Sequence, residues 1–190
     1  MMEQVMAPEN LPLRRRLIRV LLAQEAFSEA AEQISLLLPQ EQGNAHLKAT
    51  LALCYRRTGR YADALVILRD LLGEQPTAEE LLKAAVYCLD RMGARAAGMK
   101  ALESYMRQHG ESLSLLLMLG VLQYQENALE KSSQTFRKAV SVSPKDWRAN
   151  RNLGMVYRKM GNEVFAEKFL AKSAEFRLAA EAGTAASPTK

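Results

Sequence analysis

The sequence has few cysteines, prolines and tryptophans, and it lacks both long apolar runs and alternating apolar patterns. It has two cysteines, six prolines and one tryptophan among 190 residues. No apolar run reaches the roughly 18–20 residues that a transmembrane helix needs. No stretch alternates apolar and polar residues with the period of two that is typical of a half-buried strand. We therefore predict no membrane span and no β-sheet.

Catalytic and metal-binding patterns are also absent. The chain has no G-x-S-x-G or H-E-x-x-H motif, and His46 and His109 have no carboxylate or cysteine at ligand spacing. The segment 93–100 approaches a phosphate-binding loop, but its lysine comes one residue late and no Ser or Thr follows. The sequence therefore predicts no enzymatic activity, no cofactor and no metal.

The two cysteines, Cys54 and Cys88, lie thirty-four residues apart. If they occupy equivalent sites on packed helices, the axes of those helices lie about 8–10 Å apart. That distance exceeds the ~7 Å limit between the Cα atoms of a disulfide. We expect two buried free thiols, which are typical of a reducing cytosol. Arg19 interrupts the apolar run LIRVLLA near the N-terminus, so we expect no secretory signal and a cytoplasmic location.

What the chain does contain is a repeat. Apolar residues make up 48% and charged residues 25% of the sequence, a composition typical of folded proteins. A register of thirty-four residues runs from Leu11 to Ala180 without an insertion. We expect residues 1–10 to form a lead-in, with Asn10 as a candidate helix cap, and 181–190 a disordered tail after a helix that runs past Ala180. The five units are residues 11–44, 45–78, 79–112, 113–146 and 147–180.

The unit 113–146 shows the pattern most clearly. Apolar spacing with a period of 3.6 predicts two helices of about fourteen residues, joined by a turn at Asn127. The small residues Gly120 and Ser132 occupy positions where the two helix backbones must approach closely. Such a pair cannot bury its apolar stripe alone and needs neighbours of the same kind. The equivalent of Ser132 is small in every unit: Ala30, Ala64, Gly98, Ser132 and Ala166.

Turns and caps recur at the same period. A residue that tolerates the left-handed conformation should end each first helix, and a side chain that accepts a backbone hydrogen bond should precede it. Unit one breaks the turn rule with Glu25. The turn residues are Gly59, Gly93, Asn127 and Gly161, and the caps are Asn44, Ser112 and Asp146.

These residues resemble the tetratricopeptide repeat family. The resemblance is carried by Leu-Gly at positions 7–8, tyrosines such as Tyr55 and Tyr157 at position 11, the small residue at 20, and Pro76 and Pro144 at 32. It implies an all-α fold, a right-handed superhelical solenoid of stacked antiparallel helix hairpins. It also implies a concave groove lined by positions 2, 5, 9, 12 and 13 of each first helix.

The predicted groove positions are strongly basic. They carry ten cations against two acidic residues, Glu80 and Asp90, a formal charge of +8 when the whole chain has +5. A helix surface that is merely solvated would mix both signs, so the asymmetry favours binding, although a solvated face remains the alternative. The ten cations are Arg15, Arg19, Arg56, Arg57, Lys83, Arg91, Arg148, Arg151, Arg158 and Lys159.

Unit four interrupts the basic track with Leu117, Val121 and Tyr124, and Tyr87 and Met155 stand at position 9 of the flanking units. A basic trough with an apolar centre suits an acidic peptide that carries one or two hydrophobic anchors. Alternatively, a terminal segment or a second copy of the chain covers Leu117 and Val121.

The sequence therefore predicts a non-catalytic scaffold that binds an acidic or amphipathic segment of a partner protein. One alternative is a cytosolic chaperone for secretion or assembly substrates, similar in size and architecture to type III secretion chaperones. RNA binding is a lesser alternative, because the uncharged unit four breaks a continuous phosphate track. Phe165, Phe169 and Phe176 spread around the last helix, so a homodimer through the C-terminal end is also considered.

Overall fold

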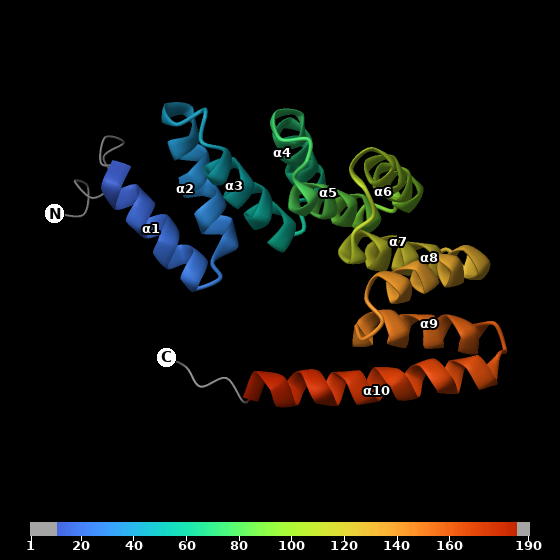
Figure 1. Cartoon of the computed structure of the whole chain (residues 1–190). Coiled ribbons are helices and arrows are strands. Elements are labelled where there is room, and N and C mark those ends of the chain that lie inside the picture. The colour runs from blue at the N-terminus through green and yellow to red at the C-terminus, as the bar shows by residue number, and fades with distance from the viewer. Residues whose placement is uncertain (1–10, 186–190) are drawn as a thin grey trace. The chain divides into compact units, whose positions relative to one another are not determined.

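The computed structural model describes residues 11–185, which form ten α-helices and one short 3-10 helix (Figure 1). The helices divide into two compact units, one ending at Gly98 and the other beginning at Met99. The helices are α1 (Leu11–Ala23), α2 (Phe27–Leu37), η2 (Leu38–Gln40), α3 (Ala45–Arg57), α4 (Tyr61–Glu74), α5 (Glu79–Arg91), α6 (Arg95–His109), α7 (Leu113–Gln125), α8 (Leu129–Val142), α9 (Trp147–Lys159) and α10 (Glu163–Ala185).

Each predicted 34-residue segment contains two helices. The first helix of every segment has thirteen residues and begins at the first position of the predicted register. In the last segment α10 continues to Ala185, so the helix includes the first five residues of the segment expected to be a disordered tail. The predicted lead-in 1–10, its candidate cap Asn10 and residues 186–190 lie outside the described residues.

The three predicted caps are confirmed. The backbone N–H of Leu47 donates to Asn44 Oδ1 at 3.0 Å, and that of Ala149 donates to Asp146 Oδ1 at 2.9 Å. Ser112 Oγ accepts a longer bond, of 3.3 Å, from the third residue of α7. Each cap satisfies one of the N–H groups that a helix N-terminus leaves without an intrahelical partner.

The predicted turns are confirmed as well, and the first repeat, residues 11–44, also has one although it lacks a glycine there. Glu25 adopts a φ of 56° and Asn127 one of 58°, while Gly59, Gly93 and Gly161 have φ between 76° and 79°. In the first turn the N–H of Ala26 donates to Leu21 O at 2.9 Å. This six-residue bond is that of a Schellman motif, which caps the carbonyl end of a helix.

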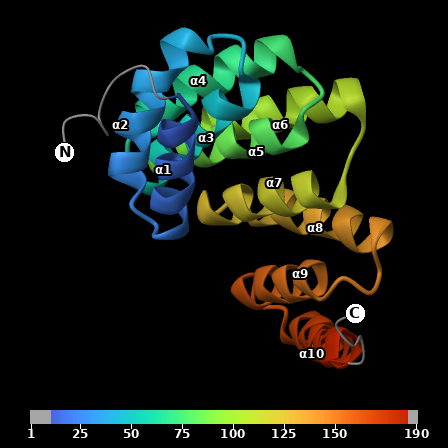
Figure 2. The ribbon, with the colours of Figure 1, turned by 90° about the vertical axis from the view of Figure 1, so that its left-hand side faces the viewer.

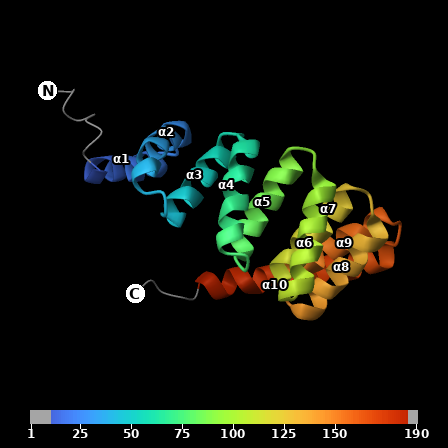
Figure 3. The ribbon, with the colours of Figure 1, turned by 90° about the horizontal axis from the view of Figure 1, so that it is seen from above.

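In the first unit, neighbouring helices from α1 to α5 pack against one another in chain order (Figure 3). One buried cluster joins α1, α2 and α3, with Ile18, Ile34 and Leu51 among its members. A second joins α3, α4 and α5 around Leu65 and Leu68. Each helix therefore buries one apolar stripe, as the period of 3.6 predicts.

In the second unit, α8 packs between α7 and α9, and α9 packs on α10 (Figure 2). The close approach predicted for Gly120 and Ser132 is confirmed, because Ser132 Oγ donates to Gly120 O at 2.8 Å in a buried position. The Phe136 ring lies directly over Gly120. It belongs to a buried cluster with Leu153 and Val156.

Both thiols, Cys54 and Cys88, are free and buried, as predicted. Burial raises the pKa of each thiol above its usual value, so both remain protonated near neutral pH. Within residues 11–185 no helix combines the length and apolarity that crossing a membrane requires. Over the same residues, no three His, Cys, Asp or Glu side chains gather closely enough to hold a metal ion.

Candidate functional site

The first helices of the repeats carry the residues predicted to line a groove. In the first unit these residues lie on α1, α3 and α5, and in the second unit on α7 and α9. Side-chain contacts between these helices include Arg56 with Tyr87, from α3 to α5, and Lys159 with Tyr124, from α9 to α7. A groove that continues through all five helices remains a prediction.

Carboxylates neutralise three of the predicted cations in the first unit. The pairs and their N–O distances are Arg15–Glu41 at 2.7 Å, Arg57–Glu25 at 3.3 Å and Lys83–Glu80 at 2.5 Å. The carboxylates lie in the loop after η2, in the turn after α1 and within α5, respectively. The other predicted acidic residue, Asp90, pairs with Arg95 at 2.7 Å. Within residues 11–185 no carboxylate forms an ion pair with Arg19, Arg56 or Arg91. The Arg91 pKa is raised mainly by the hydrogen bond with Tyr61 and to a smaller extent by the charge of Asp90.

Two of the remaining cations stack on tyrosine rings. The Arg56 guanidinium lies 5.0 Å from the centroid of the Tyr87 ring. Tyr87 meets Tyr61 edge-to-face, with ring centroids 6.0 Å apart, and Arg91 lies 5.7 Å from the Tyr61 centroid. We call these four residues the arginine–tyrosine ladder. Cation–π contacts of this kind contribute about 0.5–2 kcal/mol each and hold the guanidinium in one orientation.

The ladder cations form no ion pair with an acidic residue among the described residues. Arg56 Nε is buried without a hydrogen-bond partner there, and Arg91 Nε donates only to the Tyr61 hydroxyl, at 3.3 Å. Tyr87 is 40% exposed. An incoming carboxylate would therefore meet guanidinium groups that are oriented but not yet neutralised.

A hollow of about 410 Å³ lies beside these helices, between α1 and α3. Its lining includes the predicted groove residues Arg15 and Arg19, together with Leu22, Leu47 and other apolar side chains. Sequence reasoning did not identify this hollow. It depends on side chains from α2 and the following loop, which groove positions counted along the first helices leave out.

In the second unit, Arg148 pairs with Asp146 at 2.8 Å. Burial alone would raise the Asp146 pKa, but the hydrogen bonds from Arg148 and from the Ala149 N–H outweigh it, so the pKa lies below its usual value. Lys159 lies over the Tyr124 ring, 4.6 Å from the centroid. Within the described residues, no ion pair neutralises Arg151 or Arg158.

The predicted apolar patch of the fourth repeat, residues 113–146, is only partly exposed on the surface. Leu117 and Tyr124 are half-buried and pack against the cluster of Phe136, Leu153 and Val156. Val121 is 37% exposed, and Met155 of α9 is half-buried. Part of the expected patch therefore contributes to the core of the second unit.

Sequence reasoning also missed the role of Tyr61. This residue starts α4 and does not occupy a groove position, yet it bridges Tyr87 and Arg91. The signal available was a tyrosine directly after the turn residues Gly59 and Arg60, which no other repeat shows. That signal is too weak to identify a contact between repeats.

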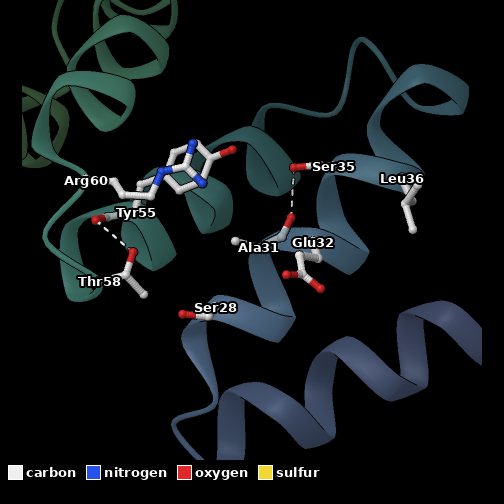
Figure 4. A pocket seen from close by; sticks show the side chains of 8 residues that line it. All are labelled: Ser28, Ala31, Glu32, Ser35, Leu36, Tyr55, Thr58 and Arg60. Atoms are coloured by element: carbon white, nitrogen blue, oxygen red, sulfur yellow. Dashed lines mark hydrogen bonds between the residues drawn. The ribbon is translucent and has the colours of Figure 1, made fainter.

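A second hollow of the first unit, about 620 Å³, lies between α2 and the corner that joins α3 to α4. Figure 4 shows Arg60 over the Tyr55 ring, with the centroid 4.1 Å away, and Leu36 at the other end of the lining. Arg60 also pairs with Asp63 at 2.7 Å. The cation here is already neutralised, which distinguishes this hollow from the ladder.

The model of the ChAPs family, the Chs5p-Arf1p-binding proteins, matches residues 21–171, which is more than half of the chain. The human protein O-mannosyl-transferase TMTC1 is 25% identical over 138 residues, which are 72% of this chain. The chain spans only 15% of the length of that relative.

Two solved structures show the same fold. A MamA structure from Desulfovibrio magneticus RS-1, beginning at its residue 41, aligns with a TM-score of 0.73 and 17% identity, covering 88% of this chain and 95% of that one. YrrB, described as a TPR protein with an unusual peptide-binding site, aligns with a TM-score of 0.61 and 15% identity, covering 86% and 84%. The all-α solenoid of tetratricopeptide-type helix hairpins is thereby confirmed.

Proposed function

The chain belongs to the ChAPs family, and we propose that it is a non-catalytic scaffold. Its first-helix faces would bind an acidic, amphipathic segment of a partner protein. The family is named for proteins that bind Chs5p and Arf1p, and YrrB is described as having a peptide-binding site. Both descriptions support a protein-binding role for this chain.

The observation that carries the proposal is the set of cations left over after internal pairing. Six predicted groove cations have no carboxylate partner within residues 11–185, whereas Glu80 and Asp90 are both paired. Positive groups that are not neutralised internally attract an acidic partner and favour its correct orientation. The six are Arg19, Arg56, Arg91, Arg151, Arg158 and Lys159.

A non-catalytic role is supported by the chemistry of the buried groups. The most nucleophilic side-chain type, cysteine, occurs only as Cys54 and Cys88, whose raised pKa values disfavour the thiolate that would react. We propose no transferase activity, because the similarity to TMTC1 covers 15% of that protein.

Selection of peptides tests the proposal directly. Immobilised full-length chain would be panned with a phage-displayed library of random dodecapeptides, and enriched peptides would be measured by fluorescence anisotropy. We expect enriched sequences to carry several Asp or Glu residues around an apolar residue. Binding should weaken as salt rises, because the Debye length falls from roughly 30 Å at 0.01 M to about 8 Å at 0.15 M.

Charge reversal locates the binding face. The double variant Arg151→Glu, Arg158→Glu should weaken peptide binding more than tenfold, about 1.4 kcal/mol or more. A matched control reverses two exposed cations of α8, Lys131→Glu and Arg137→Glu, and should change affinity less than twofold. Equal effects of the two double variants, or enrichment of peptides without acidic residues, would contradict the proposal.

Two narrower predictions remain part of this proposal. A chaperone for secretion or assembly substrates differs from a plain scaffold in having a partner that is insoluble alone.

For the homodimer through the C-terminal end, α10 leaves Phe165 44% and Leu178 66% exposed, while Phe169 and Phe176 are half-buried. With Val164, which is 78% exposed, three apolar side chains of the described part of this helix are available for contact with a second copy.

A further inference from the structure

We infer that the hollow between α1 and α3 is the anchor site of the partner segment. It would accept one aliphatic or aromatic side chain whose neighbours in the peptide are Asp or Glu. This inference rests on the proposed function and adds where the apolar anchor binds. It moves the expected anchor from α7 in the second unit to the first unit.

The floor of the hollow is apolar and already formed. Ile18 of α1, Leu37 of α2 and Leu47 of α3 are buried beneath it, and Leu22 is half-buried. The volume of about 410 Å³ lies within the range of small ligand sites. An inserted side chain would therefore gain apolar contact without requiring the floor to open.

One wall of the hollow is a fixed polar network. Glu41 accepts from Arg15 through Oε1, at 2.7 Å, and from Asn44 through Oε2, at 2.9 Å. These bonds, first from Arg15 and then from Asn44, lower the Glu41 pKa. Asn44 in turn caps α3. Both Glu41 oxygens are thus engaged, so the single acidic group of the lining is neutralised and held in place.

The rest of the rim is positive or neutral. Arg19 is exposed and has no acidic partner among the described residues, and His46 and Thr50 stand opposite it on α3. A carboxylate beside the anchor would meet Arg19 at the rim. Because the positive charge of Arg19 complements a peptide carboxylate, we expect an acidic segment of the partner to bind in the hollow.

The apolar residues of α7 are less suited to the same task. Leu117 and Tyr124 already pack against the core of the second unit, and Lys159 covers the Tyr124 ring. Val121 alone remains substantially exposed there. An anchor on α7 would have to displace existing contacts, whereas the lining of the α1–α3 hollow already encloses about 410 Å³.

The test uses an enriched acidic dodecapeptide from the selection above and the full-length chain. Thr50→Trp places an indole in the hollow and should weaken binding at least tenfold. Thr50→Ser keeps the hydroxyl that donates to His46 O at 2.8 Å and should change affinity less than twofold. Val121→Trp, the matched change on α7, should also leave affinity within twofold.

A second measurement needs no substitution. In methyl-labelled wild-type chain, the peptide should shift the resonances of Ile18, Leu22 and Leu47 and leave that of Val121 unchanged. This readout remains decisive if Thr50→Trp destabilises the first unit. Shifts confined to Leu117 and Val121 would overturn the inference.

The outcomes separate the inference from the function on which it rests. If the Arg151→Glu, Arg158→Glu variant loses binding but Thr50→Trp does not, the anchor site is wrong and the basic-face proposal stands. If neither variant matters, both are wrong. Tenfold stronger binding after removal of residues 1–10 would instead identify that segment as the occupant. Concentration-dependent shifts of the hollow methyls without peptide would identify a second copy.

Discussion

The contact between Gly120 and Phe136 gives the sharpest quantitative prediction about the fold. A Cβ atom on Gly120 would lie 2.6 Å from Phe136 Cε1 and 2.7 Å from Cζ, whereas carbon atoms prefer about 3.5–4.0 Å. The ring would have to move by about 1 Å. Phe136 is 1% exposed and packs against Leu153 and Val156, so it has little room to do so.

We therefore expect Gly120→Ala to destabilise the second unit. Overpacking of a filled core costs about 1–3 kcal/mol. Replacing glycine by alanine inside a helix returns about 1 kcal/mol through backbone propensity. Any displacement of α8 would also strain the Ser132–Gly120 hydrogen bond of 2.8 Å. Because the Cβ would lie 2.6 Å from a ring that is 1% exposed, we expect the overpacking cost in the upper part of its range, about 2–3 kcal/mol. The net loss in the free energy of unfolding should then be about 1–2 kcal/mol.

Urea unfolding followed by tryptophan fluorescence measures this loss. Trp147 is the single tryptophan and begins α9 of the second unit, so its emission reports the unit that contains Gly120. As a control, Gly73→Ala in α4 adds a Cβ with nothing within 4 Å, and far-UV circular dichroism should show no destabilisation.

A double-mutant cycle tests the cause. In a Phe136→Leu background, Gly120→Ala should cost at least about 1 kcal/mol less than in the wild type, because the smaller side chain leaves room for the Cβ. Equal stability of Gly120→Ala and wild type would refute the packing argument. So would the same cost in both backgrounds.

Two further predictions concern a turn and a cap. Glu25→Gly should stabilise the first unit by about 1 kcal/mol, because a non-glycine residue with a φ of 56° is strained. Gly59→Ala, at a φ of 79°, should cost a similar amount, and urea midpoints by circular dichroism measure both. The Asp146 pKa is lower in the folded chain, so its contribution is present above its unfolded pKa of about 3.9 and is lost as pH falls through the folded pKa. Asp146→Asn should keep the cap but flatten this pH dependence of stability. An unchanged acid profile would show that the bonds from Arg148 and from the Ala149 N–H add no pH-dependent stability through the Asp146 charge.

Much of the fold was predictable because several local requirements coincide at one period. The caps Asn44 and Asp146, the turn at Asn127 and the small pair Gly120 and Ser132 each satisfy a separate physical need. All of them place the helices in the same register. A sequence that meets cap, turn and packing requirements together leaves few alternatives for the backbone.

The turn at Glu25 shows where residue preference is overridden. Its backbone bonds match those of the glycine turn in the next repeat, since Ala26 N–H donates to Leu21 O at 2.9 Å and Arg60 N–H donates to Tyr55 O at 2.8 Å. The packing of α1 against α2 requires this chain reversal. The cost of a left-handed glutamate, about 1–2 kcal/mol, is smaller than the loss of that packing.

The candidate site was less predictable, because helical position does not specify contact partners. Leu117 and Tyr124 occupy positions that a helical wheel turns away from the core, yet both pack against the α8–α9 cluster. The wheel considers one helix at a time. It omits the neighbouring repeat that covers those positions, and it equally omits Tyr61 of the ladder.

Internal pairing also changes which cations a partner can use. A partner carboxylate that approaches Arg15 or Arg148 must compete with Glu41 or Asp146, which already bind these guanidinium groups at 2.7 Å and 2.8 Å. Exchanging one surface ion pair for another yields little, since such pairs contribute about 0–1 kcal/mol. The paired cations should therefore add little to affinity. Affinity for an acidic segment should depend on the cations that form no ion pair with a carboxylate of the chain. Formal charge at the groove positions overstates what a partner can gain. Affinity should depend first on Arg19, the two arginines of the ladder, and Arg151, Arg158 and Lys159 of α9, which form no ion pair among the described residues.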